Sequence, residues 1–205
     1  MLKGLIVGAM AAVFAVSASP VRAAEGSATA EAAALTPNTY IWNDEASMQD
    51  AAMQPVAIVV SIADQKAYVF RGKTMIAASS VSTGKDGKET PLGTFAILQK
   101  EEMHHSNLYD SAPMPFMQRL TWDGVAIHAG RNPGFPASHG CIRVPAAFAQ
   151  KLFSITAVGT LVTVTDLSAA DGLTLPEPTP DTVEAGVDAE TARANAGQLE
   201  LAAAR

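Results

Sequence analysis

The 205-residue sequence has a single cysteine, Cys141, and so cannot form a disulfide within the chain. It has no run of Lys and Arg, and its formal net charge is −6, which argues against a nucleic-acid partner. No internal repeat is present. After the first 23 residues, no stretch is apolar enough to span a membrane. These absences argue against a disulfide framework, a repeat architecture and a nucleic-acid-binding protein.

The start of the chain is typical of a secretory signal peptide, predicted over residues 1–23. Lys3 precedes an uncharged apolar run over 5–16, and Val21-Arg22-Ala23 places small residues where a signal peptidase reads them. A membrane anchor is the alternative, but the apolar run is short for a span. The sequence therefore predicts cleavage after Ala23 and an exported protein of the periplasm or cell envelope, with no membrane span after cleavage.

Composition divides the rest of the chain into three parts. Residues 24–54 are rich in Ala and acidic residues and predict a linker, flexible over 24–36, with a short packed segment near Tyr40 and Trp42. Residues 55–166 are predicted to form the globular domain, and 167–205 a disordered tail rich in Pro, Ala and acids. The acidity belongs to the flanks, because residues 55–166 hold ten bases and eight acids.

Short strands separated by turns dominate the pattern of the central domain. The expected strands cover 56–62, 66–70, 74–81, 94–98, 116–120, 125–128 and 161–165. A long loop is expected over 103–115, and a helix is expected to begin at Pro145. The predicted fold class is therefore mainly β, a β-sandwich or partly open barrel with one short helix after the loop that holds Cys141.

The lone cysteine lies in a segment that has the residues thiol catalysis needs. A thiol attacks a carbonyl only as thiolate, and an imidazole can take its proton and later return it to a leaving amine. His128 ends an expected strand, and a loop with Gly and Pro can fold back to bring Cys141 beside it. Gly140 permits close approach of the backbone to a substrate, and the N–H groups around it are candidates for an oxyanion hole.

The element Ser138-His139-Gly140-Cys141-Ile142-Arg143, with a histidine upstream, resembles the signature of the L,D-transpeptidases of the YkuD type. Two earlier segments, VSTGK at 81–85 and TPLGTF at 90–95, resemble strands and turns of that family, so the resemblance covers about residues 55–166. Two departures are present. The first element reads His128-Ala129-Gly130 instead of His-Gly-Thr, and residues 146–148 lack the acidic residue that is usual there.

The resemblance implies a role for each residue of the motif. Cys141 is the nucleophile, and His128 is the general base and acid, with its ring oriented by the carbonyl of Ala129. Arg143 holds the loop or binds a substrate carboxylate. The residues that shape the site and its oxyanion hole are, by the same resemblance, Ser138, His139 and Gly140. No metal and no organic cofactor is implied.

The resemblance also implies the reaction, that of an enzyme acting on peptidoglycan stem peptides. A stem tetrapeptide forms a thioester with Cys141, D-Ala leaves, and the acyl group passes to an amine in cell-wall synthesis or remodelling. The sequence leaves the acceptor open between another stem peptide, an outer-membrane lipoprotein and a free D-amino acid.

Other functions compete with this interpretation. An L,D-carboxypeptidase or amide hydrolase would use the same fold and thioester but end with water. A wall-binding module would keep the fold but have lost catalytic turnover. The presence of both Cys141 and His128 argues against it. An exported metal-binding protein would use imidazole and thiolate ligands, which suit zinc or copper. Its candidate ligands are His104, His105, His128, His139 and Cys141, whose spacing matches no familiar zinc motif. Of these, His104 and His105 are expected in the long loop as solvated or rim residues.

Overall fold

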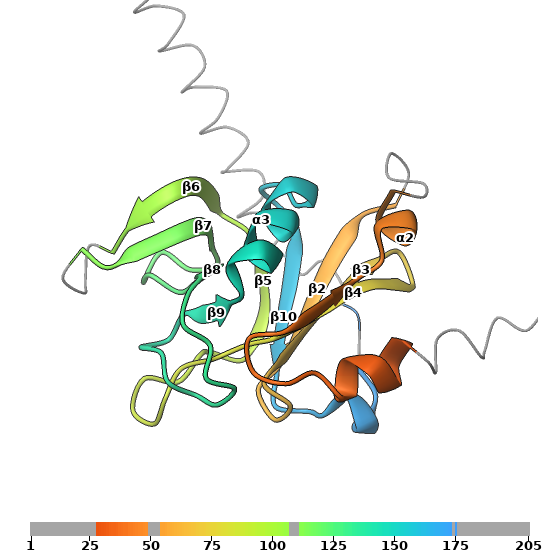
Figure 1. The fold of residues 1–205 in the computed structure, drawn as a ribbon. Helices are drawn as coiled ribbons and strands as arrows, with labels where there is room; N and C mark the ends of the chain where they lie inside the picture. The colour runs from red at the N-terminus through yellow and green to blue at the C-terminus, as the bar shows by residue number, and fades with distance from the viewer. Residues whose placement is uncertain (1–27, 49–53, 107–110, 174, 176–205) are drawn as a thin grey trace, which may run out of the picture.

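The computed structural model of the protein describes residues 28–48, 54–106, 111–173 and 175. The predicted signal peptide and most of the predicted tail, from residue 176 onward, lie outside these residues. In the part of the chain that is described, no helix has the length and apolar character needed to cross a membrane. The described residues form two β-sheets and few helices, of which α3 (Ala146–Ile155) packs on strands of the smaller sheet (Figure 1).

The larger sheet has six strands in the order β1-β4-β3-β2-β10-β5. Their bounds are β1 Tyr40–Trp42, β2 Val56–Ser61, β3 Lys66–Arg71, β4 Thr74–Ser80, β5 Gly93–Ala96 and β10 Leu161–Thr165. Neighbours are antiparallel except β2 and β10, which are parallel. In β2, the consecutive residues Ile58, Val59 and Val60 are all fully buried. A continuous β-branched run forms this strand because both of its faces are covered.

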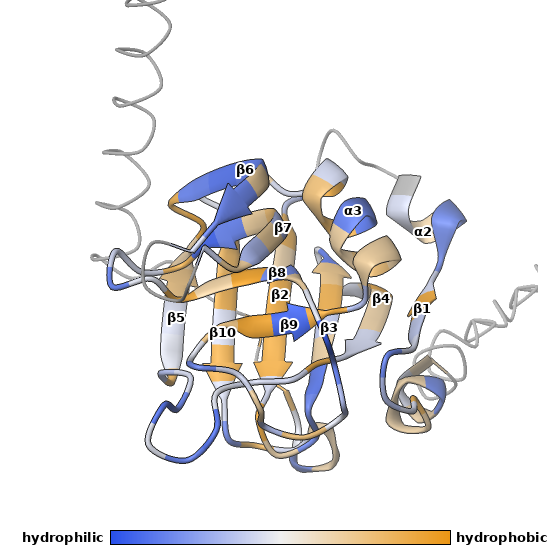
Figure 2. Ribbon diagram, turned by 60° about the vertical axis from the view of Figure 1, so that its left-hand side comes forward, coloured by the Kyte–Doolittle hydropathy of each residue, from blue (hydrophilic) through white to orange (hydrophobic). Residues whose placement is uncertain are grey.

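The smaller sheet has four strands in the order β6-β7-β8-β9. Their bounds are β6 Gln99–His105, β7 Pro113–Arg119, β8 Ala126–Ala129 and β9 Ile142–Val144. The pair β8–β9 is parallel, and the other pairs are antiparallel. Figure 2 shows that β6 is largely hydrophilic, whereas β2 and β10 are largely hydrophobic.

The long loop expected over 103–115 is wrong, because most of its described residues belong to the hairpin of β6 and β7. The sequence QKEEMHH of β6 has no apolar alternation, and most of the strand is only partly covered. A two-stranded edge of this kind is held by backbone hydrogen bonds, which leave little trace in a hydropathy pattern.

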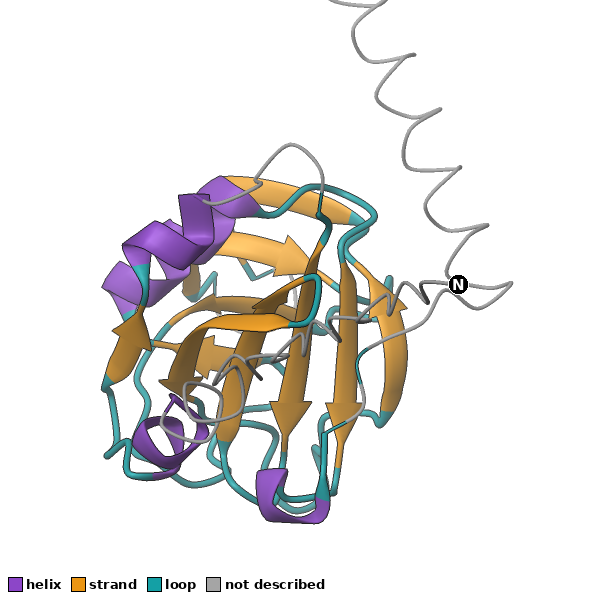
Figure 3. Ribbon diagram, turned by 90° about the vertical axis from the view of Figure 1, so that its right-hand side faces the viewer, coloured by secondary structure: helices purple, strands orange, loops and turns teal. Residues whose placement is uncertain are grey.

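The main core lies between the two sheets and under α3. It combines Ile58 and Val60 of β2 with Ile127 of β8 and Ile142 of β9, and Phe148 of α3 closes one end. The Phe148 ring lies 5.8 Å from that of Tyr40 and 5.7 Å from that of Trp42, so β1 packs on the helix. Strands make up most of the fold, and the helices lie at its periphery (Figure 3).

The described parts of both flanks are more ordered than their composition predicts. Residues 28–33 are helical, and Ala32 is fully buried against Tyr68 and Ala78, so the expected flexible linker is wrong for this segment. A second short helix, α2 (Asp44–Met48), follows β1. After β10, the Asp64 carboxylate accepts hydrogen bonds from the Ser168 hydroxyl and from the Ala169 N–H, each at 2.7 Å. These bonds hold the short helix η1 (Ala169–Asp171) in place, so the expected disorder does not begin at residue 167.

The fold class expected from the sequence is confirmed as mainly β with few helices among the described residues. Two mixed sheets face each other across a shared core, and they do not close into a barrel. This arrangement brings the ends of β8 and β9 to the surface beside the β6–β7 hairpin, where the candidate site lies (Figure 1).

Candidate active site

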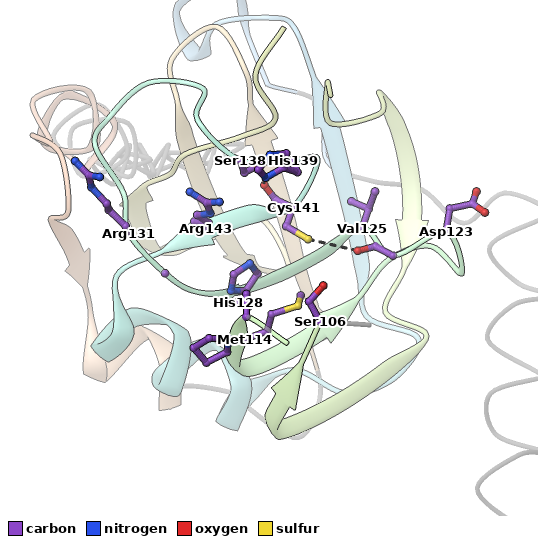
Figure 4. A pocket seen from close by; sticks show the side chains of 14 residues that line it. Ser106, Met114, Asp123, Val125, His128, Arg131, Ser138, His139, Cys141 and Arg143 are labelled. Carbon is purple, nitrogen blue, oxygen red and sulfur yellow. Dashed lines mark hydrogen bonds between the residues drawn. The ribbon is translucent and has the colours of Figure 1, made fainter. Parts of the chain in front are cut away.

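A cleft of about 450 Å³ contains most of the residues that the sequence singled out. Five of them line it: Cys141, His128, Ser138, His139 and Arg143 (Figure 4). Ala129 and Gly140 contribute through their backbone groups, as described below. Met114 of β7 and Gly124 from the turn before β8 complete part of the wall.

The parallel pairing of β8 with β9 brings the histidine and the cysteine together. His128 is the register partner of Arg143, and Cys141 lies directly before β9. Alternate residues of a strand share a face, so Cys141, Arg143 and their neighbour His128 point to the same side of the sheet. Ile127 and Ile142, on the other side, are buried in the core. The candidate site therefore lies on one face of β8 and β9, and the opposite face of the same strands packs in the apolar core.

His128 is almost fully buried, with 7% of its surface exposed. Its Nδ1 lies 2.8 Å from the carbonyl oxygen of Ala129, which can only accept, so Nδ1 carries the proton and Nε2 is the basic nitrogen. Burial lowers the pKa of His128 to about 4, and the hydrogen bond to Ala129 opposes the shift, while the charges of Arg143 and His104 add to it. The imidazole is therefore neutral at pH 7.

The thiol of Cys141 is also neutral at rest. Its Sγ lies 3.4 Å from the carbonyl oxygen of Gly124, to which it donates (Figure 4). Burial raises the pKa of Cys141, against a smaller lowering by the Ala126 N–H and by the charges of Arg143 and Arg119. The pair is thus a protonated thiol and a neutral imidazole, and not a preformed thiolate–imidazolium pair.

Hydrogen bonds within the loop fix the backbone around the cysteine. The Ser138 hydroxyl donates to the Cys141 carbonyl and accepts from the Gly140 N–H at 3.1 Å. Gly140 has a φ of +118°, a backbone conformation that residues other than glycine rarely adopt. Because the Gly140 N–H is engaged by Ser138, the Cys141 N–H is the better candidate for an oxyanion donor.

The segment TPLGTF supports this loop from the larger sheet. The buried Thr90 hydroxyl donates to the Gly140 carbonyl at 2.8 Å and accepts from the Gly84 N–H at 2.9 Å. A Cβ on Gly84 would lie 2.0 Å from the Lys88 carbonyl oxygen, so only glycine fits there. The two motifs that are far apart in sequence are therefore one structural unit.

Arg143 both holds the loop and faces the cleft. Its Nη1 donates to the Ala137 carbonyl oxygen at 3.4 Å, and its stem packs on Gly130, where a Cβ would lie 3.1 Å from Arg143 Cγ. Its backbone pairs with Ser82 in both directions, at 3.0 Å each. The side chain lines the cleft as well, so loop anchoring and carboxylate binding are compatible.

A second groove of about 370 Å³ adjoins the cleft and shares Met114 and Gly124 with it. It is lined by His104, which belongs to β6 and not to a solvated loop; its side chain is 15% exposed, and its Nδ1 lies 2.7 Å from Glu101 Oε2. Sequence reasoning missed Arg119, which lines the groove from β7, and Glu101 of β6, which contacts His104. A polar strand such as β6 has no apolar alternation to show which side chains share a face.

The metal-site alternative gains no support from the geometry. Among the described residues, no group of three or more His, Cys, Asp or Glu side chains is arranged to hold a metal ion. His128 uses Nδ1 for a backbone carbonyl, and His104 uses it for a carboxylate.

Comparisons with known proteins agree with the geometry. Residues 55–164 match the family model of the YkuD L,D-transpeptidase catalytic domain. An L,D-transpeptidase from Mycobacterium smegmatis is 25% identical, with a TM-score of 0.52, over 55% of this chain and 59% of that one. One from Stackebrandtia nassauensis is 26% identical, with a TM-score of 0.50, over 55% and 56%.

A third solved structure, the LD transpeptidase LdtMt1 in complex with imipenem, is 25% identical, with a TM-score of 0.51, over 55% of this chain and 59% of that one. The alignment thus spans less than two thirds of the length of each of these relatives. No curated protein matches the chain.

Proposed function

This chain belongs to the YkuD family of L,D-transpeptidase catalytic domains, and from this premise we propose that it is a cysteine transpeptidase of peptidoglycan stem peptides. Cys141 forms a thioester with a stem tetrapeptide, D-Ala leaves, and the acyl group passes to an amine. The observation that carries the proposal is the cleft that Cys141 and His128 both line, with the basic nitrogen of His128 set by the Ala129 carbonyl. No metal or cofactor is needed for this chemistry.

In the acylation step, the protonation states decide the role of each group. The thiol is protonated and the imidazole neutral, so His128 Nε2 takes the proton as the sulfur attacks the scissile carbonyl. The Ala129 carbonyl accepts from Nδ1–H and stabilises the imidazolium that forms. Because the pKa of His128 is about 4, the imidazolium readily gives its proton to the leaving amine of D-Ala.

The loop supplies the remaining elements of the reaction. The Cys141 N–H is the proposed donor to the oxyanion, and Ser138 keeps the backbone in the required conformation through its two hydrogen bonds. Arg143, with its guanidinium facing the cleft, is proposed to attract a carboxylate of the stem peptide. The acceptor is another stem peptide, a lipoprotein or a free D-amino acid, and water as acceptor would make the enzyme an L,D-carboxypeptidase.

Intact-protein mass spectrometry with a carbapenem tests the nucleophile. A β-lactam carbonyl is strained, so ring opening by Cys141 leaves a stable adduct, and the imipenem complex of LdtMt1 motivates the choice of probe. We expect one adduct per chain, on the peptide that contains Cys141, and none in Cys141→Ser. An unmodified wild-type protein would contradict the proposal. Products formed from a tetrapeptide with and without an amine then separate transfer from hydrolysis.

Export follows from the proposed substrate, which lies outside the cytoplasmic membrane. The predicted signal peptide over 1–23 supports this location. Amino-terminal sequencing of the protein from the cell-envelope fraction should give a start near Ala24. A start at Met1 in the soluble cytoplasm would contradict it.

A further inference from the structure

His104 lines the second groove, which adjoins the cleft of Cys141. The groove meets the cleft of Cys141 at Met114 and Gly124, and the Gly124 carbonyl accepts the hydrogen bond of the Cys141 thiol. His104 is the register partner of Met114 across the β6–β7 hairpin. Cys141 packs on the cluster that contains Met114. A second imidazole, that of His104, is thus paired across the hairpin with Met114, which belongs to the cluster on which Cys141 packs.

The backbone of the hairpin is distorted where it holds this histidine. The pairing of β6 with β7 skips Glu102 and Phe116, and Phe116 has a left-handed φ of +55°. A regular strand points residues three apart to opposite faces, yet Glu101 and His104 contact each other. A non-glycine residue with such a φ is strained and persists only where its surroundings hold it in place, often at functional sites.

A chain of hydrogen bonds orients the imidazole. Arg119 Nε donates to Gln99 Oε1 at 2.8 Å, and Gln99 Nε2 donates to Glu101 Oε1. The other oxygen of Glu101 accepts from His104 Nδ1 at 2.7 Å. Because the Glu101 carboxylate holds the Nδ1 proton, Nε2 is the nitrogen of the neutral imidazole that can take a proton from a ligand in the groove. A carboxylate behind an imidazole also stabilises the imidazolium that then forms.

From these contacts we propose that His104, positioned by Glu101, is the base for the acceptor amine in the second half of the reaction. The inference rests on the proposed function and assigns a residue to its transfer step. His128 serves the donor side in the cleft, and His104 serves the amine that enters through the groove.

The step balances without a further reactant. The neutral amine attacks the thioester carbonyl, the C–N bond forms as the C–S bond breaks, and the amine proton passes to His104 Nε2. Cys141 leaves as thiolate and takes a proton from solvent, to which His104 releases its own. His104 could also activate water, so the reaction favours transfer over hydrolysis when the amine fills the groove and excludes water. His104 and Glu101 thereby influence the partition between transfer and hydrolysis.

Single-turnover mass spectrometry on the full chain separates the two halves of the reaction. A stem tetrapeptide first loads the enzyme, the thioester is followed with time, and glycine amide is then added as the amine probe. We expect His104→Gln to slow the amine-dependent decay of the thioester at least tenfold more than it slows thioester formation, with more hydrolysed product. Glu101→Gln should lose less, and the double variant should lose no more than His104→Gln, because Glu101 acts through His104.

The neighbouring exposed histidine gives the matched control, since His105→Gln should behave as the wild type in both halves. Equal slowing of both halves by His104→Gln, or transfer at the wild-type rate, would overturn the inference. Glu101→Gln, which is isosteric, provides the same comparison if His104→Gln folds poorly. A wild-type enzyme that forms no thioester would instead contradict the proposed function, so the two failures are distinguishable.

Discussion

The two sheets of this molecule use their side chains differently. In the six-stranded sheet, β2 and β4 bury most of their residues and β3 buries half, and the buried residues are apolar or small. In the four-stranded sheet, β6 is polar and partly exposed, while β8 is buried but contains His128. The titratable and nucleophilic side chains of interest all lie on or beside the smaller sheet, namely His128, Cys141 and His104.

This difference assigns separate tasks to the two sheets. The larger one contributes apolar burial, which is the main favourable term in folding. The smaller one keeps one face in that core through Ile127 and Ile142, and its other face holds polar groups at defined distances. A site placed on strands that are backed by a packed core is held more precisely than one on free loops.

The largest effect should come from the larger sheet. Ile58→Ala removes a fully buried side chain from its central strand and should lower the free energy of unfolding by roughly 2–5 kcal/mol. Met103→Ala, on β6 with 68% of its surface exposed, should change it by less than about 0.5 kcal/mol. Urea unfolding measures both. Similar losses in the two variants would break the comparison between the sheets.

The buried histidine should make stability depend on pH in a defined window. Its pKa is about 4 in the folded protein and 6.5 when unperturbed, so between these values the unfolded state binds more protons. Stability is therefore lost as pH falls from 6.5 to 4, by roughly 3 kcal/mol in total from this group, and is unaffected by it above 6.5. Urea unfolding of the wild type and of His128→Gln at pH 7.5 and 4.5 gives the difference.

The wild type should lose more stability than His128→Gln over that interval, since the other titrating groups cancel. Identical losses would mean that His128 is not held neutral by burial. Arg143 and His104 are the charged or titratable groups that add to the shift, so a reduced difference in Arg143→Met would support the same cause.

Loss of His128 as the base should have the next effect in size. Expressed as a free energy, the slower acylation is smaller than the upper limit of the stability loss in Ile58→Ala. His128→Ala should slow acylation by a carbapenem by roughly a hundredfold or more, the usual scale for a general base. In the wild type, acylation should hold from neutral pH down to about pH 5 and then fall as His128 protonates, because its pKa is about 4. Stopped-flow or timed mass spectrometry measures both, and a fall already near pH 6.5 would contradict the neutral resting pair.

The smallest effect tests the connection between the sheets. Thr90→Val removes a hydroxyl that bonds both Gly84 and Gly140, leaving two buried backbone groups unpaired, and should cost about 1–3 kcal/mol. It should also slow acylation, because the loop of Cys141 loses its support. Thr94→Val is the control, since its hydroxyl bonds Thr163 within the larger sheet. A loss of stability in Thr90→Val without slower acylation would show that the two sheets are catalytically independent.

Prediction from the sequence succeeded where one property dominated a segment. The strands over 56–62 and 161–165 were predictable because a β-branched run has few alternatives to a buried strand. The residues of the cleft were predictable because a cysteine, a histidine and a glycine-rich loop carry a specific chemical motif. The strand β6 was missed because its residues are polar on both faces. The helical segment near Ala32 was missed because alanine-rich sequence also suits an unpacked linker.

The sequence by itself determined the mainly β character of the chain, the nucleophile and base that we propose, and the motif that identifies the family, since each depends on residue types at short spacing. Only the tertiary structure decided the protonation states of Cys141 and His128, because these depend on burial and on charges from other strands. It also decided that His104 lines a groove beside the cleft of the thiol and contacts Glu101. That juxtaposition depends on the pairing of β6 with β7 and on a backbone distortion at Phe116, and neither follows from local sequence.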